Sequence, residues 1–342
     1  MINFILICLC LASNNYKVDG RMMASMSQEE DLELENQLRL MNKPPLKTIQ
    51  TAFGHIVDCI DINKQLVFDN PLLKNHKIQL RSSLEHARKT LNEDQRSARS
   101  SRIEIEEDLC PIGTIPVRRT TKDDLIRIKH LSNKNGMLIA EAPGNHFAAV
   151  TLNRGANITD VYYGIKGIIN VYNPTVTRKE QMSGAYLYLA KGPNSIMAGW
   201  QVYPEIHGDV KTYFFTAWDP ATNNWWVRLQ DKDLGYFPAT LFADMTSAEE
   251  GGWYGRTMTP TYNSPSPPMG SGHFPDHTFG HACYIRNMTF QKYTREDIEP
   301  TLDLVGIYKD MPSCYEMSYT GYVDDSLRYA MQFGGPGGNC GY

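Results

Sequence analysis

The pattern of hydrophobic and polar positions divides the chain into two regions. From about Glu29 to Arg102, charged and polar residues dominate, and the run from Glu29 to Leu34 is compatible with a helix. Gln79 to Arg102 is rich in Arg, Ser, Glu and Lys and has few large apolar residues. Such a stretch cannot bury a core by itself, so it predicts a surface helix or a flexible linker.

From His146 onward the pattern changes to short alternating runs separated by turn residues. Alternation of apolar and polar positions is typical of strands that bury one face. The turn signals between the runs include Asn173-Pro174, Gly192-Pro193 and Asp219-Pro220. Many strands without intervening helices favour an antiparallel sandwich or barrel. The predicted strands are His146–Leu152, Val161–Tyr172, Gly184–Ala190, Met197–Tyr203, Val210–Trp218, Trp225–Leu229 and Ala282–Gln291.

Composition supports a folded protein rich in sheet. The 342 residues are 42% hydrophobic and 21% charged, which argues against a disordered chain, a collagen-like chain and a coiled coil. The 36 aromatic residues, with many Gly and Pro, favour strands and turns over helices. The net charge of −4 leaves no basic excess to neutralise phosphates, so we expect no nucleic-acid partner. No cofactor motif is recognised.

The N-terminus predicts export. Ile2 to Ala12 is an almost unbroken apolar run of about 16 Å as a helix, which fits a signal peptide over residues 1–20 cut between Ser13 and Gly20. An N-terminal strand or a misplaced start codon are the alternatives. No later segment reaches eighteen apolar residues, so no transmembrane span is expected. Export makes Asn157 and Asn287 candidate glycosylation sites, and the expected destination is extracellular, in the cell wall or in the vacuole.

Cysteine usage agrees with export. Two of the seven cysteines fall in the expected signal, and no CxxC pair or Cys/His spacing indicates a metal site. We expect a disulfide between Cys314 and Cys340, because it would hold a Gly/Pro-rich tail that has little core of its own. A second is expected between Cys59 and Cys110, which leaves Cys283 over.

A series of motifs, in order along the chain, resembles the neprosin family of plant secreted proteins. The resemblance runs from about Leu40 to Tyr342. Its N-terminal part is similar to the activation peptide of that family, and its C-terminal part to the peptidase domain. The motifs are Asp58–Gln65, Phe68–His76, Cys110–Thr120, Tyr162–Gly164, Ile169–Pro174, Ala198–Pro204, Trp225-Trp226, Gly235–Pro238, Met269–Pro275 and Gly334–Gly337.

The resemblance implies a fold and an activity. Characterised members are glutamic endopeptidases that cut at proline, work in acid and are made as zymogens. It implies an all-β fold, an antiparallel β-sandwich with a groove, preceded by a partly helical or irregular activation-peptide region that blocks the groove until low pH. We therefore expect an activation-peptide-like region over 21–135 and a peptidase-like domain over 136–342. Two facing glutamates would activate water and protonate the leaving amine.

This chain departs from the family where that chemistry resides. Met197 stands where the first glutamate is expected, directly before Ala198-Gly199-Trp200. Matched on its tryptophan, the second glutamate falls on Arg256, or on Thr257 if the match shifts by one. Neither a thioether, a guanidinium nor a threonine hydroxyl can act as the carboxylate does. Several strands are also expected to be missing after Asp209, through a rebuilt sheet or a gene-model error.

These departures predict a pseudopeptidase. The expected partners are a peptide or Pro-rich protein and the chain's own activation peptide. Gln201, Trp253, Tyr254 and Arg256 are the groove candidates, because Gln201 shares the strand face of Met197 and aromatic rings suit prolyl rings. The alternatives are an active acid peptidase with a rearranged carboxylate such as Glu250, and a non-enzymatic binder of Pro-rich wall protein or carbohydrate.

Overall fold

The computed structural model describes most of the chain in eleven stretches. They are residues 28–51, 54–80, 110–132, 144–152, 160–192, 194–208, 212–215, 224–229, 232–242, 245–260 and 264–341. The expected signal peptide, the sequon at Asn157 and most of the short segment that follows Asp209 lie outside the described residues. Within the described ranges, none of the helices combines the length and the apolar character that a membrane crossing requires.

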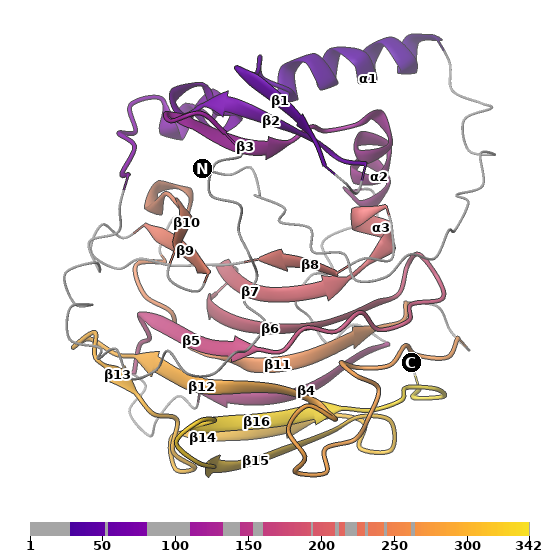
Figure 1. Cartoon of the computed structure of the whole chain (residues 1–342), viewed down its shortest axis with the longest axis vertical. Helices are drawn as coiled ribbons and strands as arrows, with labels where there is room; N and C mark the ends of the chain where they lie inside the picture. The colour runs from indigo at the N-terminus through magenta and orange to yellow at the C-terminus, as the bar shows by residue number, and fades with distance from the viewer. Residues whose placement is uncertain are drawn as a thin grey trace.

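The N-terminal region, residues 28–132, forms a small layer of its own (Figure 1). Its three-stranded antiparallel sheet has the order β1-β2-β3. The Cys59–Cys110 disulfide joins β2 to the chain just before β3, as expected from sequence. The elements are α1 (Gln28–Met41), β1 (Lys47–Gln50), β2 (Ile56–Asp61), β3 (Thr114–Arg118), α2 (Lys122–Ser132) and three short 3-10 helices, Ile62–Lys64, Leu66–Asp69 and Pro71–Leu73.

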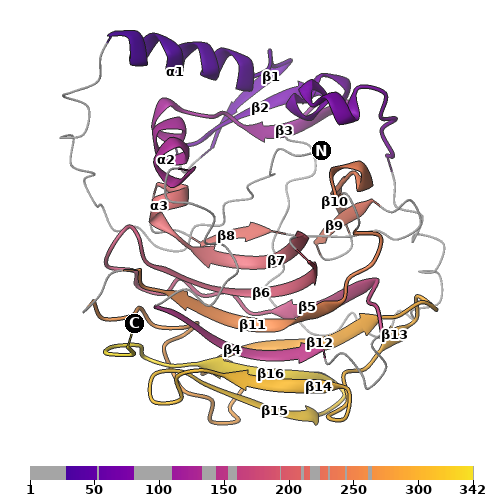
Figure 2. The same cartoon turned by 180° about the vertical axis from the view of Figure 1, so that it is seen from behind.

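The larger part of the molecule is a sandwich of two antiparallel sheets, which confirms the expected all-β fold (Figures 1 and 2). The six-stranded sheet has the order β14 (Val305–Lys309), β4 (Asn145–Leu152), β11 (Glu250–Met258), β6 (Met182–Lys191), β7 (Asn194–Val202), β8 (Thr212–Phe215). The second sheet has the order β13 (Asp297–Ile298), β12 (Cys283–Gln291), β16 (Tyr329–Gly334), β15 (Glu316–Tyr322), with β5 (Gly164–Ile169) paired to β12.

Smaller elements lie between the sandwich and the N-terminal region. The short helix α3 (Pro204–His207) follows β7 directly, and β9 (Trp225–Leu229) pairs with β10 (Lys232–Phe237) as a separate hairpin. A 3-10 turn, Ala239–Leu241, follows the hairpin. In the described parts of the chain, the N-terminal region contacts the sandwich domain through α2 against α3 and through the 3-10 helix Pro71–Leu73 against the turn after β10.

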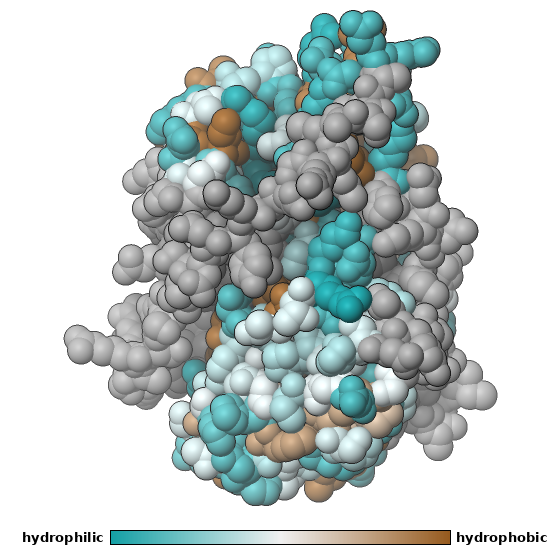
Figure 3. All heavy atoms as spheres, turned by 90° about the vertical axis from the view of Figure 1, so that its right-hand side faces the viewer, coloured by the Kyte–Doolittle hydropathy of each residue, from teal (hydrophilic) through white to brown (hydrophobic). Residues whose placement is uncertain are grey.

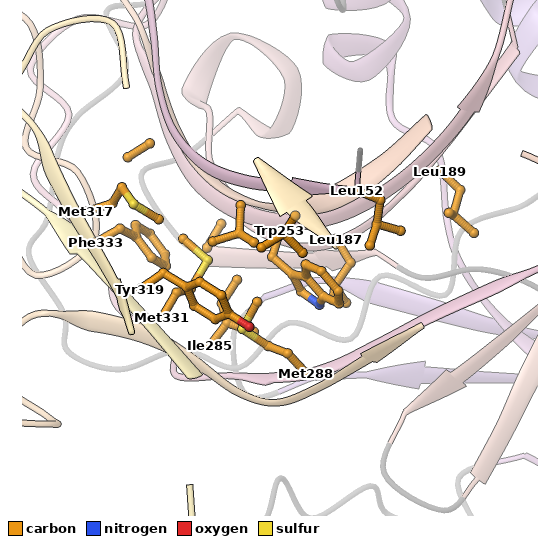
Figure 4. Close-up of a cluster of buried hydrophobic side chains, with 14 of the residues drawn as sticks. Leu152, Leu187, Leu189, Trp253, Ile285, Met288, Met317, Tyr319, Met331 and Phe333 are labelled. Carbon is orange, nitrogen blue, oxygen red and sulfur yellow. The ribbon is translucent and has the colours of Figure 1, made fainter. Parts of the chain in front are cut away.

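Large apolar side chains fill the space between the two sheets (Figure 4). Trp253 and Leu187 of the six-stranded sheet lie near Ile285 of the second sheet, and Phe333 belongs to the same core cluster. Alternate residues of a strand point to opposite faces, so Trp200 lies in this core while Met197 and Gln201 lie on the other face. On the face drawn in Figure 3, exposed apolar residues form separate patches rather than one continuous surface.

Glycines allow the sheets to approach closely in β11. A Cβ atom built on Gly255 would lie 2.3 Å from the ring of Phe333 in the second sheet. A Cβ atom on Gly252 would lie 2.4 Å from the carbonyl oxygen of Val150. Only glycine fits at these positions, and the strand that carries much of the candidate site therefore has an unusual composition for a strand.

The C-terminal tail is held to the sandwich by the second disulfide. Cys314 is bonded to Cys340, as expected from sequence, across a separation of 26 residues. Both cysteines belong to the main core cluster, and Cys283 remains a buried free thiol in the same core. The two disulfides of the described residues thus secure the N-terminal region and the tail separately.

Candidate functional site

One face of the six-stranded sheet points away from the second sheet and carries the residues singled out from sequence. We call it the tyrosine face. Its buried members are Ala149, Met182, Tyr186, Tyr203, Tyr254 and Met258, and Phe147, Tyr188, Met197 and Ile206 pack against them half-buried. The face is contributed by β4, β11, β6 and β7 and by the start of α3.

Met197 meets Tyr254 on this face. The Tyr254 hydroxyl donates to Met197 Sδ at 3.0 Å. The Tyr254 ring is stacked on Tyr186 at 5.1 Å between centroids and meets the edge of Tyr188 at 5.3 Å. Burial raises the pKa of Tyr254 well above its usual value, so its proton stays in place. The pair is a thioether and a neutral phenol, and neither can activate water.

Arg256 lies elsewhere on the same face. Across the sheet, Met197 of β7 is paired with Tyr188 of β6, and Tyr188 is paired with Gly252 of β11. Gly252 is therefore the β11 residue level with Met197, whereas Arg256 is level with Gly184. Four strand positions separate Gly252 from Arg256, which is roughly 13 Å along the strand. The side chain that the structure brings to Met197 is therefore that of Tyr254.

Arg256 is integrated into its surroundings. Its Nε and one terminal nitrogen donate to Asn145 Oδ1 at 3.2 and 2.8 Å. Its guanidinium lies 5.5 Å from the ring centroid of Phe147, a cation–π contact, and the residue is 5% exposed. A permanent cation held in this way suits structure or binding and cannot serve as a base.

Two residues proposed from sequence face the interior instead. Trp253 is 0% exposed, and its Nε1 donates to the carbonyl oxygen of Lys166 at 2.8 Å (Figure 4). The prediction that Trp253 lines the groove is wrong, because odd-numbered residues of β11 point between the sheets. Thr257 pairs with Ser183, shares that inward direction and is fully buried. Only Gln201, Tyr254 and Arg256 of the groove candidates lie on the tyrosine face.

A buried polar chain links the tyrosine face to α3. The Tyr186 hydroxyl donates to Gln201 Oε1 at 2.7 Å, and Gln201 Nε2 lies 2.9 Å from His207 Nε2. Burial, followed by the charges of Arg118 and Arg127, lowers the pKa of His207 to about 3. The neutral ring can therefore accept the hydrogen bond from the Gln201 amide.

The N-terminal region supplies the charges around His207. The Asp124 carboxylate is paired with Arg118 at 2.9 Å and with Arg127. Burial opposes ionisation of Asp124, but hydrogen bonds from Thr121 and the two arginines outweigh it and lower its pKa. A Cβ atom on Gly208, which ends α3 at φ 83°, would lie 2.7 Å from the Arg127 guanidinium carbon. α2 therefore rests closely on the end of α3.

Glu205 and Glu250 lie at opposite ends of this side of the sheet. Glu205 accepts from the Tyr203 hydroxyl at 3.4 Å, next to the end of the sheet where Met258 pairs with Met182. Glu250 is exposed and lies at the opposite end of β11, eight strand positions from Met258 or roughly 26 Å. In the described part of the chain, no three His, Cys, Asp or Glu side chains come together in a way that could hold a metal ion.

Sequence reasoning did not select His207, although a local signal was present. Pro204 and Gly208 flank Glu205-Ile206-His207, and Pro at the first helical position with Gly just past the end marks a helical turn. The signal predicts α3 but not its neighbours. Arg118, Asp124 and Arg127 come from a segment some eighty residues earlier, and only the fold shows that they meet His207.

Comparison with known families covers both regions of the chain. The model described as Neprosin matches residues 179–221 and 218–336, two segments that meet beside the stretch after Asp209. The model described as Neprosin activation peptide matches residues 48–150 and thus extends into β4 of the sandwich. Matches of both kinds, in this order, show that the chain belongs to the neprosin family and carries its activation-peptide region ahead of the neprosin domain.

Proposed function

We propose that this protein is a secreted neprosin-family member that does not cleave peptides and instead binds a proline-rich peptide on its tyrosine face. The contact between Met197 and Tyr254 carries the proposal. Met197 replaces the expected catalytic glutamate, and the side chain that reaches it is also no carboxylate. The two disulfides support secretion, because such bonds persist in oxidising compartments.

The tyrosine face has the chemistry of a prolyl-binding surface. Prolyl rings pack well on aromatic faces, and Tyr188 presents a half-buried ring beside Met197. Burial and then the charge of Glu250 raise the pKa of Tyr188 to about 12, so its hydroxyl remains a hydrogen-bond donor for a peptide carbonyl. An acid peptidase built on Glu250 is disfavoured by the distance between Glu250 and Glu205.

We also propose that the stretch after Asp209 is shorter than in other members. The neprosin match is divided into two segments here, 179–221 and 218–336, which overlap by a few residues shortly after Asp209. β8 and the β9–β10 hairpin are the described elements on either side of this stretch. Sequencing of the transcript would distinguish a rebuilt sheet from a skipped exon.

The full chain should leave a proline-containing peptide intact in acid. Secreted protein would be held at about pH 3, where paired carboxylates titrate, and both chain and peptide would be followed by intact-mass spectrometry. No cleavage is expected from protein shown to be folded, because a thioether and a phenol meet at the position of the first expected glutamate. Cleavage after proline would contradict the proposal and would direct attention to Glu250.

A proline-rich peptide should bind the uncleaved protein, and Tyr188→Ala should weaken that binding about tenfold through loss of ring contact. Tyr293→Ala is the matched control, since Tyr293 is 80% exposed near the end of the other sheet. Isothermal titration calorimetry would measure both. Equal affinities for the two variants would remove the tyrosine face as the binding surface.

A further inference from the structure

The β9–β10 hairpin already carries an extended piece of this chain. Residues 76–80 follow the 3-10 helix Pro71–Leu73 without regular secondary structure and lie against the hairpin. His76 Nε2 lies 2.6 Å from the Tyr236 hydroxyl, and the Gln79 backbone N–H donates to the same hydroxyl at 3.0 Å. Asn224 Nδ2 donates to Gln79 Oε1 at 3.2 Å.

The proton assignments in these contacts are mutually consistent. Burial lowers the pKa of His76, so a neutral ring can accept the Tyr236 proton at Nε2. The Tyr236 oxygen is then available to accept from the Gln79 N–H. The Tyr236 hydroxyl therefore bonds two positions of the segment at once. It donates to the His76 imidazole and accepts from the Gln79 backbone N–H.

The hairpin side of the contact is held in place by its own neighbours. The Ala239 N–H donates to Asn224 Oδ1 at 3.0 Å, which fixes the amide and directs Nδ2 to the segment. Tyr236 is the cross-strand partner of Trp226, with ring centroids 4.9 Å apart. Recognition groups held in this way lose little freedom on binding, which is the basis of preorganised recognition.

Burial along the segment separates the contacting residues from their exposed neighbours. Lys77 and Leu80 are exposed, whereas His76, Ile78 and Gln79 are half-buried. The polar groups that the hairpin satisfies are an imidazole nitrogen, a backbone N–H and a carboxamide oxygen. This division is the pattern expected of a recognised peptide rather than of a connecting loop.

We propose that Asn224 and Tyr236, with Tyr236 supported by Trp226, form a peptide-binding site, distinct from the tyrosine face, for an extended segment that carries His and, three residues later, Gln. In this chain the segment at 76–80 occupies the site. A peptide of the same chemistry from another source competes for it. The site belongs to the separate β9–β10 sheet, so it does not depend on the prolyl binding proposed above.

A full-length protein with His76→Ala and Gln79→Leu tests the proposal. In this variant the segment at 76–80 has lost the side chains that contact the hairpin and competes less for the site. A fluorescent peptide of residues 73–80 should therefore bind the variant at least tenfold more tightly than the wild-type protein. Lys77→Ala protein is the matched control and should behave as the wild type does, because Lys77 is exposed. Fluorescence anisotropy at neutral pH measures all three.

Tyr236→Phe and Asn224→Leu, added separately to the double variant, should each weaken the peptide about tenfold through loss of hydrogen bonds. Near-UV circular dichroism would establish that each protein is folded. Hydrogen exchange at residues 76–80 would show that the chain's own segment has undocked. The proposal would be overturned if the peptide showed no saturable binding to the folded double variant. It would also be overturned if adding Tyr236→Phe or Asn224→Leu left the affinity of the double variant for the peptide unchanged.

Discussion

Glutamates placed together at Met197 and Tyr254 should create acid peptidase activity in this protein. The Tyr254 hydroxyl now reaches Met197 Sδ at 3.0 Å, and a glutamate side chain is shorter than that of tyrosine, so two glutamates here would face each other across a gap that admits a water molecule. Carboxylates that face each other in this way shift each other's pKa. One would stay protonated in acid while the other ionises, which is the division of roles that acid-catalysed amide hydrolysis needs. Cleavage of a proline-containing peptide at about pH 3 to 4 should exceed that of the wild type by at least about a hundredfold.

Met197→Glu with Arg256→Glu is the matched control, since it introduces the same number of carboxylates. Arg256 lies four strand positions from the row of Met197, so the pair would be too far apart to share a proton. The control should remain inactive. Activity in the control alone would show that the tryptophan-based match identifies the functional position, and inactivity of both folded proteins would show that more than the carboxylates has been lost.

Acid should detach α2 from α3, with His207 as the main sensor. The pKa of His207 is about 3 in the docked state, against about 6.5 for an exposed histidine. The detached state therefore binds more protons between these values, and docking free energy falls as pH drops from about 6.5 toward 3. For a ring that becomes fully solvated on detachment, the maximum loss is about 5 kcal/mol. Asp124, whose pKa is lowered, adds a further loss below its ordinary value of 3.8.

His207→Gln should flatten this pH dependence. Glutamine can still hydrogen-bond Gln201 but takes up no proton, so the pH at which α2 loses protection should move downward by about one unit or more. Hydrogen exchange of α2 between pH 7 and pH 3 would measure it. His281→Gln is the control, because His281 is exposed and pairs with Asp276 away from α2. An unchanged midpoint in His207→Gln would exclude His207 as the sensor.

Alternating patterns predicted much of the sandwich, and the gaps have a physical cause. β4, β6, β7, β9 and β12 fall close to the predicted strands. β11 was not predicted, since Gly251, Gly252 and Gly255 remove the branched residues that mark a strand. Those glycines are required by the approach of Phe333 and Val150, which are distant in sequence.

Strand periodicity predicts which face of the sheet a residue of the site occupies, but not which residue of another strand it meets. Period two correctly separated Met197 and Gln201 from Trp200. The partner of Met197 depends instead on the register of three strands, which places Tyr254 beside it. A motif match aligned on Trp253 places Arg256 at the second glutamate position but contains no information on strand pairing. Trp253 itself points into the core and therefore gives no indication of which side chain meets Met197 on the opposite face.

Among the described residues, the contacts that join the N-terminal region to the sandwich domain include α2 on α3 and residues 76–80 on the β9–β10 hairpin. Two linked contacts behave as a bivalent ligand, in which an opened contact is re-formed at a local concentration in the millimolar range while the other holds. Release therefore requires both to open together, and its probability follows the product of two opening equilibria. Each contact contains a histidine whose pKa is lowered, so that product, and with it the probability of release, rises on acidification more steeply than either opening equilibrium alone.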